Sequence, residues 1–206
     1  MRKVTCPCEQ TFSVEIPEKI DLDRNPENYD KLIEGNLLSC VCPTCEAVLN
    51  LDLALTVSWP SKNTIIHMIP EIERLALVSG KLSVKKNSSY VVGYAELVDR
   101  IIVLKENLEP VVIESIKYHL LQKAKESRTK TTPIVFFEKI NESGELEFHI
   151  HGIRENEVAV TRVPKHLYNS IKEDYIKNPD KEDYTALCNG SYCSVRNVLI
   201  EDSPNA

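Results

Sequence analysis

Cysteines that could hold a metal ion are concentrated near the start of the chain. Five of the seven cysteines lie within the first 45 residues, in two short clusters that both contain proline. The first cluster is Cys6-Pro7-Cys8, and the second is Cys40-Val41-Cys42-Pro43-Thr44-Cys45. A structural zinc ion is typically bound by four soft ligands in a tetrahedron, and thiolates from two tight turns can supply all of them. The spacing therefore predicts one Zn²⁺ site formed by Cys6, Cys8, Cys42 and Cys45.

The two clusters differ in the spacing of their cysteines. One residue separates Cys6 from Cys8, whereas two residues separate Cys42 from Cys45. Either the shortened turn still chelates, or Cys40 replaces Cys6 or Cys8 as a ligand. A site with four thiolates leaves no open position for a catalytic water, so we expect a structural zinc ion. A thiol-redox enzyme that uses Cys42 and Cys45 is an alternative, although such pairs usually lead into a helix and Cys45 leads into a strand-like segment.

A second group of residues that can bind metal lies in the last third of the chain. His149 and His151 alternate with apolar residues, so both imidazoles are expected on one face of a strand. Cys188 and Cys193 could complete a second metal site with them. We favour a polar, solvent-facing strand edge as the interpretation of the two histidines. Cys188 and Cys193 flank a turn and could also form a disulfide, which a reducing compartment disfavours.

Composition indicates a soluble globular protein with room for one or two domains. The chain has 206 residues, of which 42% are hydrophobic and 27% are charged. No apolar run is long enough to span a bilayer, and the first residues lack the apolar segment of a secretory signal. Cysteines without such a signal indicate a reducing compartment, so we expect a cytoplasmic protein without a membrane partner.

The charge distribution bears on the class of partner. The net charge of -6 disfavours a nucleic-acid partner. A basic cluster at the expected end of a helix nevertheless keeps a nucleic-acid-binding zinc-ribbon protein as an alternative; it comprises Lys123, Lys125, Arg128 and Lys130. We expect a protein partner, and the oligomeric state is left open.

Motifs for catalysis are missing from the sequence. It contains no glycine-rich phosphate loop, no Gly-x-Ser-x-Gly elbow and no His-Glu-x-x-His motif. No catalytic residue is assigned, and a non-enzymatic interaction or scaffold role is favoured over an enzyme.

Hydrophobic periodicity predicts an α+β protein. A zinc-ribbon-like β-rich module over residues 1–70 precedes a helical pair over 71–130, and a β-meander with a helix follows over 131–206. We expect two domains, 1–130 and 131–206. Within the first, the pattern predicts a single strand over residues 48–57 and a helix whose apolar side includes Ile72, Leu75 and Ala76. The predicted pair of longer helices covers residues 94–105 and a segment that begins at Leu108-Glu109-Pro110.

The cysteine clusters and the two longer helices resemble the bacterial CpXC family. That family is defined by two Cys-Pro-x-Cys motifs, which Cys6-Pro7-Cys8 and Cys42-Pro43-Thr44-Cys45 resemble, and the similarity extends over about residues 1–130. The resemblance implies zinc binding and no established biochemical activity. This chain departs from the pattern by one missing residue in the first motif. Glu9 and Glu46 also stand where zinc knuckles usually have glycine, the residue that most readily adopts a left-handed backbone.

Overall fold

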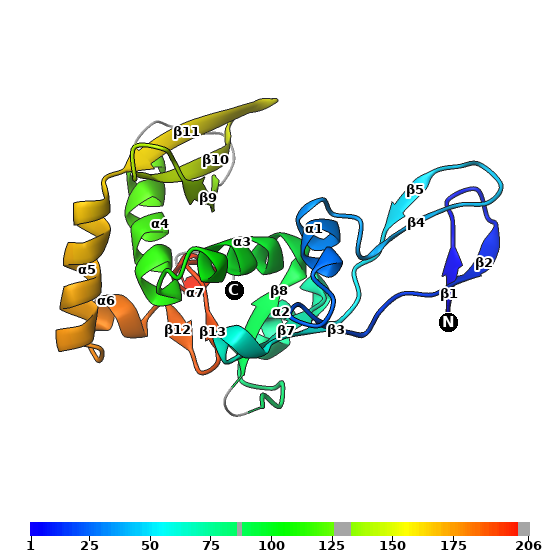
Figure 1. Ribbon diagram of the computed structural model, residues 1–206, viewed down its shortest axis with the longest axis horizontal. Helices are drawn as coiled ribbons and strands as arrows, with labels where there is room; N and C mark the ends of the chain where they lie inside the picture. The colour runs from blue at the N-terminus through cyan, green and yellow to red at the C-terminus, as the bar shows by residue number, and fades with distance from the viewer. Residues whose placement is uncertain (86–87, 126–132, 202–206) are drawn as a thin grey trace. The chain divides into compact units, whose positions relative to one another are not determined.

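Helices and antiparallel strand groups are both present in the described residues, which confirms the predicted α+β class (Figure 1). A computed structural model of the protein describes residues 1–85, 88–125 and 133–201. The chain divides into two compact units, Met1–Val98 and Asp99–Ala206, and the division falls inside helix α3 (Gly93–Lys105). The other elements of the first unit are β1 (Arg2–Thr5), β2 (Thr11–Val14), β3 (Lys19–Asp21), α1 (Glu27–Ile33), β4 (Ser39–Val41), β5 (Val48–Asn50), β6 (Leu55–Trp59), η1 (Pro60–Lys62), β7 (Thr64–Ile69), η2 (Glu71–Glu73), α2 (Arg74–Val78) and β8 (Ser89–Val92).

Two short antiparallel hairpins carry the N-terminal cysteines. Strand β1 pairs with β2, with Thr5 opposite Thr11, so the hairpin turn contains Cys6 and Cys8. Strand β4 pairs with β5, with Val41 opposite Val48, so the second turn contains Cys42 and Cys45. Each turn therefore projects its sulfurs from the end of a two-stranded ribbon, and Figure 1 shows the two hairpins side by side.

A sheet with the strand order β3-β6-β7-β8 forms the rest of the β structure in the first unit. Strands β6 and β7 form an antiparallel hairpin around Pro60–Lys62, with Leu55 opposite Met68. Alternate residues of β6 are buried, namely Leu55, Val57 and Trp59. The single strand predicted over residues 48–57 is wrong, because residues 51–54 interrupt it. Its first part, β5, pairs with β4, and its second part, β6, pairs with β3 and β7.

Two short helices accompany this sheet. Helix α1 ends at Ile33, and Gly35 follows in the left-handed conformation with a φ of 80°, which is a common way for a helix to end. The prediction of an apolar side that includes Ile72 and Leu75 is wrong, since these side chains are 89% and 70% exposed. Leu77 is buried instead, because the segment is a 3₁₀ turn followed by only five α-helical residues and the periodicity of a longer helix does not apply.

The second unit packs helices against an antiparallel three-stranded sheet. The strand order is β11-β10-β9, and Leu146, Phe148 and Ile150 of β10 point into the core. Helix α4 contacts both α5 and β9, so it covers the inner face of the sheet. The elements after α3 are α4 (Pro110–Lys125), β9 (Ile134–Ile140), β10 (Leu146–Arg154), β11 (Glu157–Val163), α5 (Lys165–Lys177), α6 (Glu182–Thr185), β12 (Cys188–Asn189), β13 (Tyr192–Cys193) and α7 (Arg196–Glu201).

A buried ionic network joins several elements of the second unit. The Lys117 ammonium pairs with Asp99 and lies 2.8 Å from Glu114 Oε1. The second oxygen of Asp99 accepts the backbone N–H of Phe137 at 2.7 Å, and that of Glu114 accepts the N–H of Val195 at 2.8 Å. Burial raises the pKa of Asp99, while Lys117 acts in the opposite direction. The network fixes α3, α4, β9 and the segment before α7 to one another.

The helical pair shares its core with the C-terminal strands. Val103 of α3 and Val112 of α4 belong to the same apolar cluster as Phe137 and Phe148. The division into two domains, 1–130 and 131–206, stays a prediction.

Candidate metal centre

The two cysteine turns close over different numbers of residues. In the first, the N–H of Glu9 donates to the carbonyl of Cys6 at 2.8 Å, three residues back. In the second, the N–H of Glu46 donates to the carbonyl of Cys42 at 3.0 Å, four residues back. Each turn is then completed by the N–H of its first cysteine, which donates to the carbonyl of Gln10 or Ala47 at 2.9 Å. The first turn therefore accommodates its missing residue by closing one position earlier.

The left-handed residue of each turn is a glutamate. Glu9 has a φ of 69° and Glu46 a φ of 60°, so both adopt the conformation that glycine normally provides in a knuckle. The backbone reverses directly after the second cysteine in both turns. Replacement of glycine by glutamate therefore leaves the knuckle backbone in place, at a cost in conformational energy of about 1–2 kcal/mol per residue.

The four sulfurs predicted as ligands converge. Each lies within 4.8 Å of the other three, with Cys6 Sγ 3.5 Å from Cys45 Sγ and Cys8 Sγ 3.7 Å from Cys42 Sγ. Sulfurs at the corners of a tetrahedron with Zn–S bonds of about 2.3 Å lie about 3.8 Å apart. A disulfide requires about 2.05 Å. The spacing therefore fits sulfurs that surround one metal ion.

Backbone N–H groups around the sulfurs lower the pKa values of the thiols to different extents. The N–H groups of Cys45 and Thr44 lower the pKa of Cys42 to about 6. The N–H of Cys8 lowers the pKa of Cys6, but burial and hydrogen bonds with the other three thiols raise it to about 12. Cys42 thus receives two backbone donors where Cys6 receives one, as expected from the extra residue in the second turn. These donors could not be identified individually from the sequence; the available signal is the proline after each first cysteine, which has no N–H and leaves the donation to other residues of the turn.

The cluster is buried on one side and open on the other. Cys6 and Cys42 are buried, whereas Cys8 and Cys45 are exposed. Cys40 lies outside the cluster, buried on β4 opposite Leu49. The four cysteines that converge are thus those of the predicted ligand set, and they could bind a metal ion.

The second candidate set does not converge in the same way. Among the residues that the structure describes, the four-cysteine cluster is the one group of three or more potential ligands with adjacent ligand atoms. His149 Nδ1 lies 3.6 Å from a carboxylate oxygen of Glu138, and His151 packs edge-on against Phe136. Cys188 and Cys193 face each other across the β12–β13 hairpin.

The predicted basic cluster lies largely outside the described residues. Arg128 and Lys130 lie outside the described residues, as does the Lys125 side chain, while Lys123 is exposed near the end of α4.

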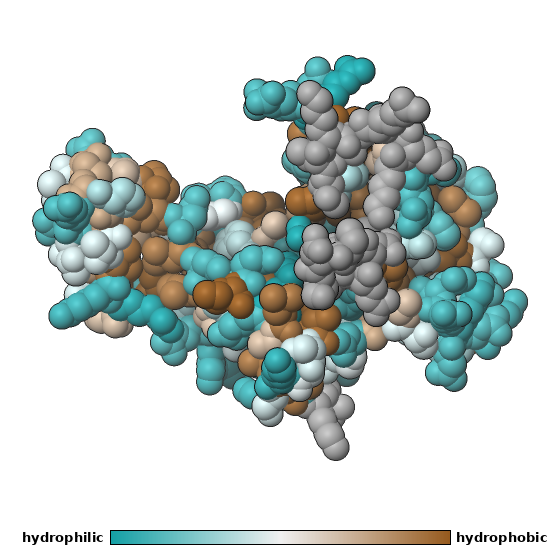
Figure 2. Space-filling model, turned by 180° about the vertical axis from the view of Figure 1, so that it is seen from behind, coloured by the Kyte–Doolittle hydropathy of each residue, from teal (hydrophilic) through white to brown (hydrophobic). Residues whose placement is uncertain are grey.

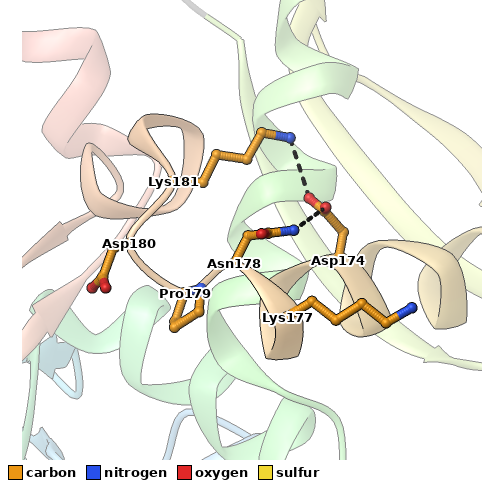
Figure 3. Close-up of a pocket in the computed structure, with 6 residues that line it drawn as sticks. All are labelled: Asp174, Lys177, Asn178, Pro179, Asp180 and Lys181. Carbon is orange, nitrogen blue, oxygen red and sulfur yellow. Dashed lines mark hydrogen bonds and ion pairs between the residues drawn. The ribbon is translucent and has the colours of Figure 1, made fainter.

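A surface hollow of about 590 Å³ lies where α5 leads into α6 (Figure 3). Its central carboxylate, Asp174, accepts hydrogen bonds from Tyr184 Oη at 2.7 Å, Asn178 Nδ2 at 3.0 Å and Lys181 Nζ at 3.2 Å. The Tyr184 hydroxyl and the other donors lower the pKa of Asp174. The carboxylate is therefore engaged in hydrogen bonds within the protein.

No helix in the described ranges combines the length and the apolar composition that a membrane crossing needs.

This chain is similar to a known protein family and to a known bacterial protein. The family model described as "CpXC protein" matches residues 4–117, which include both cysteine turns and the start of α4. An uncharacterised protein of Treponema pallidum (strain Nichols) is 29% identical over 219 aligned positions, which cover 98% of this chain and all of the relative. No solved structure matches the chain.

Proposed function

Because the chain belongs to the CpXC family, we propose that Cys6, Cys8, Cys42 and Cys45 bind one structural Zn²⁺ ion. The observation that carries this proposal is the convergence of four sulfurs to within 4.8 Å of one another. Thiolates favour soft or borderline ions, and a tetrahedral four-sulfur set is typical of zinc. The ion takes up all four sulfurs, so no position is left for a substrate or a catalytic water.

The ion stabilises an otherwise small β module. Strands β1, β2, β4 and β5 contain only three or four residues each, which is too short for an isolated hairpin to be stable. Structural zinc contributes about 10–16 kcal/mol of binding free energy at neutral pH, which is available to hold the two turns together. The thiols must stay reduced for this, so the proposal includes a reducing compartment such as the cytoplasm.

A non-enzymatic role in binding another protein is the second part of the proposal. Figure 2 shows apolar residues exposed on several parts of the surface, with polar residues between them. Val41 and Val48 are directly opposite each other on β4 and β5, next to the metal turn, and are 59% and 66% exposed. Two adjacent, exposed apolar side chains beside the Cys42–Cys45 turn offer an apolar surface for contact with a partner protein.

Elemental analysis and thiol counting test the zinc site. Purified full-length protein is expected to hold one zinc ion per chain, and four thiols should become reactive only after a chelator removes it. The proposal would be overturned if protein purified with reductant contained no metal and the thiols of Cys6, Cys8, Cys42 and Cys45 were all reactive. A Cys42–Cys45 disulfide in such protein would favour the thiol-redox alternative.

Cross-linking with a matched control tests the interaction surface. The Val41→Ser/Val48→Ser variant should no longer cross-link to the proteins that wild type cross-links to. It should still bind zinc. Val158→Ser/Val160→Ser removes two exposed valines of β11 and should retain the partners. Equal capture by all three proteins would exclude the Val41–Val48 pair from the contact.

A further inference from the structure

The hairpin β12–β13 places two cysteines in direct opposition. Cys188 and Cys193 lie directly opposite each other in its short antiparallel pairing. The N–H of Ser194 donates to the carbonyl of Leu187 at 2.9 Å, which makes the neighbouring pair, Leu187 and Ser194, a hydrogen-bonded pair. Along an antiparallel ladder, directly opposite residues alternate between hydrogen-bonded and non-hydrogen-bonded pairs. Cys188 and Cys193 are next to a hydrogen-bonded pair and therefore form a non-hydrogen-bonded pair. Cα atoms in such pairs lie about 4.5 Å apart, and disulfides bridge Cα separations of about 4.4–6.8 Å.

Contacts outside the sulfurs hold this hairpin in place. A guanidinium N–H of Arg100 donates to the carbonyl of Cys193 at 2.7 Å. The side-chain amide of Asn197 donates to the carbonyl of Leu187 at 2.8 Å. Both strands are thus anchored through their backbone, and neither anchor involves a thiol. A bond between the two sulfurs therefore requires side-chain rotation and no strand separation.

The two thiols are unequal in access and in acidity. Cys188 is half-buried, whereas Cys193 is buried. A hydrogen bond from Cys193 lowers the pKa of Cys188, and the same contact together with burial raises the pKa of Cys193. The more accessible sulfur is thus also the better thiolate, which is the arrangement of an attacking and a resolving cysteine.

We infer that Cys188 and Cys193 form a reversible dithiol–disulfide couple that responds to small-molecule disulfides. The Cys188 thiolate attacks one sulfur of the small disulfide, whose S–S bond breaks and releases one thiolate. Cys193 then gives up its proton, and its sulfur attacks Cys188, which releases the second small thiolate. The two cysteines lose two electrons in total, the small disulfide gains them, and the two thiol protons end on the released thiols.

This couple is independent of the proposed zinc site. The family match ends at residue 117, well before the hairpin. Within the described ranges, no third ligand joins the two cysteines to make a metal site. Short hairpin disulfides that a thiol pool can reach are easily reduced, so the couple is compatible with a reducing compartment.

Peptide mapping after incubation in glutathione buffers tests the inference on the full-length, metal-loaded protein. Trypsin cleavage after Lys181 and Arg196 releases both cysteines in one peptide, apart from the other five. Oxidised glutathione should convert this peptide to an internal disulfide, and reduced glutathione should restore two thiols. The peptides that carry Cys6 and Cys8, or Cys40, Cys42 and Cys45, should keep their thiols. Two free thiols in the Glu182–Arg196 peptide under the most oxidising buffer would overturn the inference.

Single variants test the order of the two steps. Cys193→Ser should accumulate a stable glutathione adduct on Cys188, whereas Cys188→Ser should react about tenfold more slowly. Circular dichroism verifies that each variant folds, and Cys193→Ala replaces Cys193→Ser if the buried hydroxyl prevents folding. A glutathione adduct that persists on Cys188 of wild type, without an internal disulfide, would also contradict the inference.

Discussion

Cys6 Sγ lies 3.5 Å from Cys45 Sγ, although 39 positions separate the two residues in the sequence. The contact joins the turn of one hairpin to the turn of another, and Cys8 with Cys42 repeats it at 3.7 Å. Each close sulfur pair thus takes one member from each turn. A metal ion bound between them would therefore link the two hairpins to each other.

Removing one clustered sulfur should remove the metal. Cys45→Ser is expected to lose the zinc ion, because three thiolates and a hydroxyl bind zinc far less tightly. Cys40→Ser is the control, since Cys40 is buried on β4 outside the cluster and this variant should retain the ion. Elemental analysis of both purified proteins is the measurement. Equal zinc in both variants, or loss from Cys40→Ser alone, would contradict the ligand assignment.

Replacing a left-handed glutamate by glycine should stabilise the protein. Glu46→Gly relieves the steric cost of a φ of 60°, and we expect an increase of about 1 kcal/mol in the free energy of unfolding. Glu15→Gly removes the same charge at a residue without positive φ, and should lower stability by about 0.5–1 kcal/mol. Urea titration of the metal-loaded proteins compares the two. A stability loss in Glu46→Gly would show that the glutamate side chain itself contributes to the turn.

Removing the buried ammonium should strongly destabilise the second unit. Lys117→Met leaves Asp99 and Glu114 buried without their cation, and breaking a buried pair in this way costs about 3–5 kcal/mol. Lys123→Met on the same helix is the control, since Lys123 is exposed and its loss should change stability by less than about 0.5 kcal/mol. Urea unfolding measures both. A further change of Asp99 to Asn and Glu114 to Gln should recover part of the loss.

The imidazole of His67 should make stability depend on pH. Burial, followed by the charges of Lys85 and Lys19, lowers the pKa of His67 below its ordinary value of 6.5. The unfolded chain then binds a proton more readily than the folded protein, so this contribution to stability is complete above pH 6.5 and is lost as the pH falls below it.

Stability curves of a variant test this pH dependence. His67→Gln keeps a polar partner near Thr56 Oγ1, which lies 3.1 Å from the imidazole, and should flatten the curve below pH 6.5. His119→Gln removes an exposed imidazole and serves as the control. Thermal unfolding at several pH values provides the curves. If the stability of His67→Gln fell below pH 6.5 as steeply as that of wild type, His67 would be ruled out as the source of the pH dependence.

Most individual elements of the fold could be predicted from local sequence signals. Pro110 at the start of α4, Gly35 after α1 and the alternation of Leu146, Phe148 and Ile150 each act over a few residues. The errors arose where the pairing of strands in the tertiary structure decides where an element begins and ends. Residues 48–57 read as one apolar strand, but β5 and β6 pair with different strands, and only the three-dimensional sheet reveals the break.

By itself, the sequence determined the ligand candidates and the α+β class, because cysteine spacing and hydrophobic periodicity are local properties. The tertiary structure alone decided that Cys40 lies outside the cluster, that Glu9 and Glu46 adopt the left-handed backbone, and that Cys188 faces Cys193 in a non-hydrogen-bonded pair. Each of these depends on strand register and turn closure. Hydrogen bonds between separate segments set both, and no single segment encodes them.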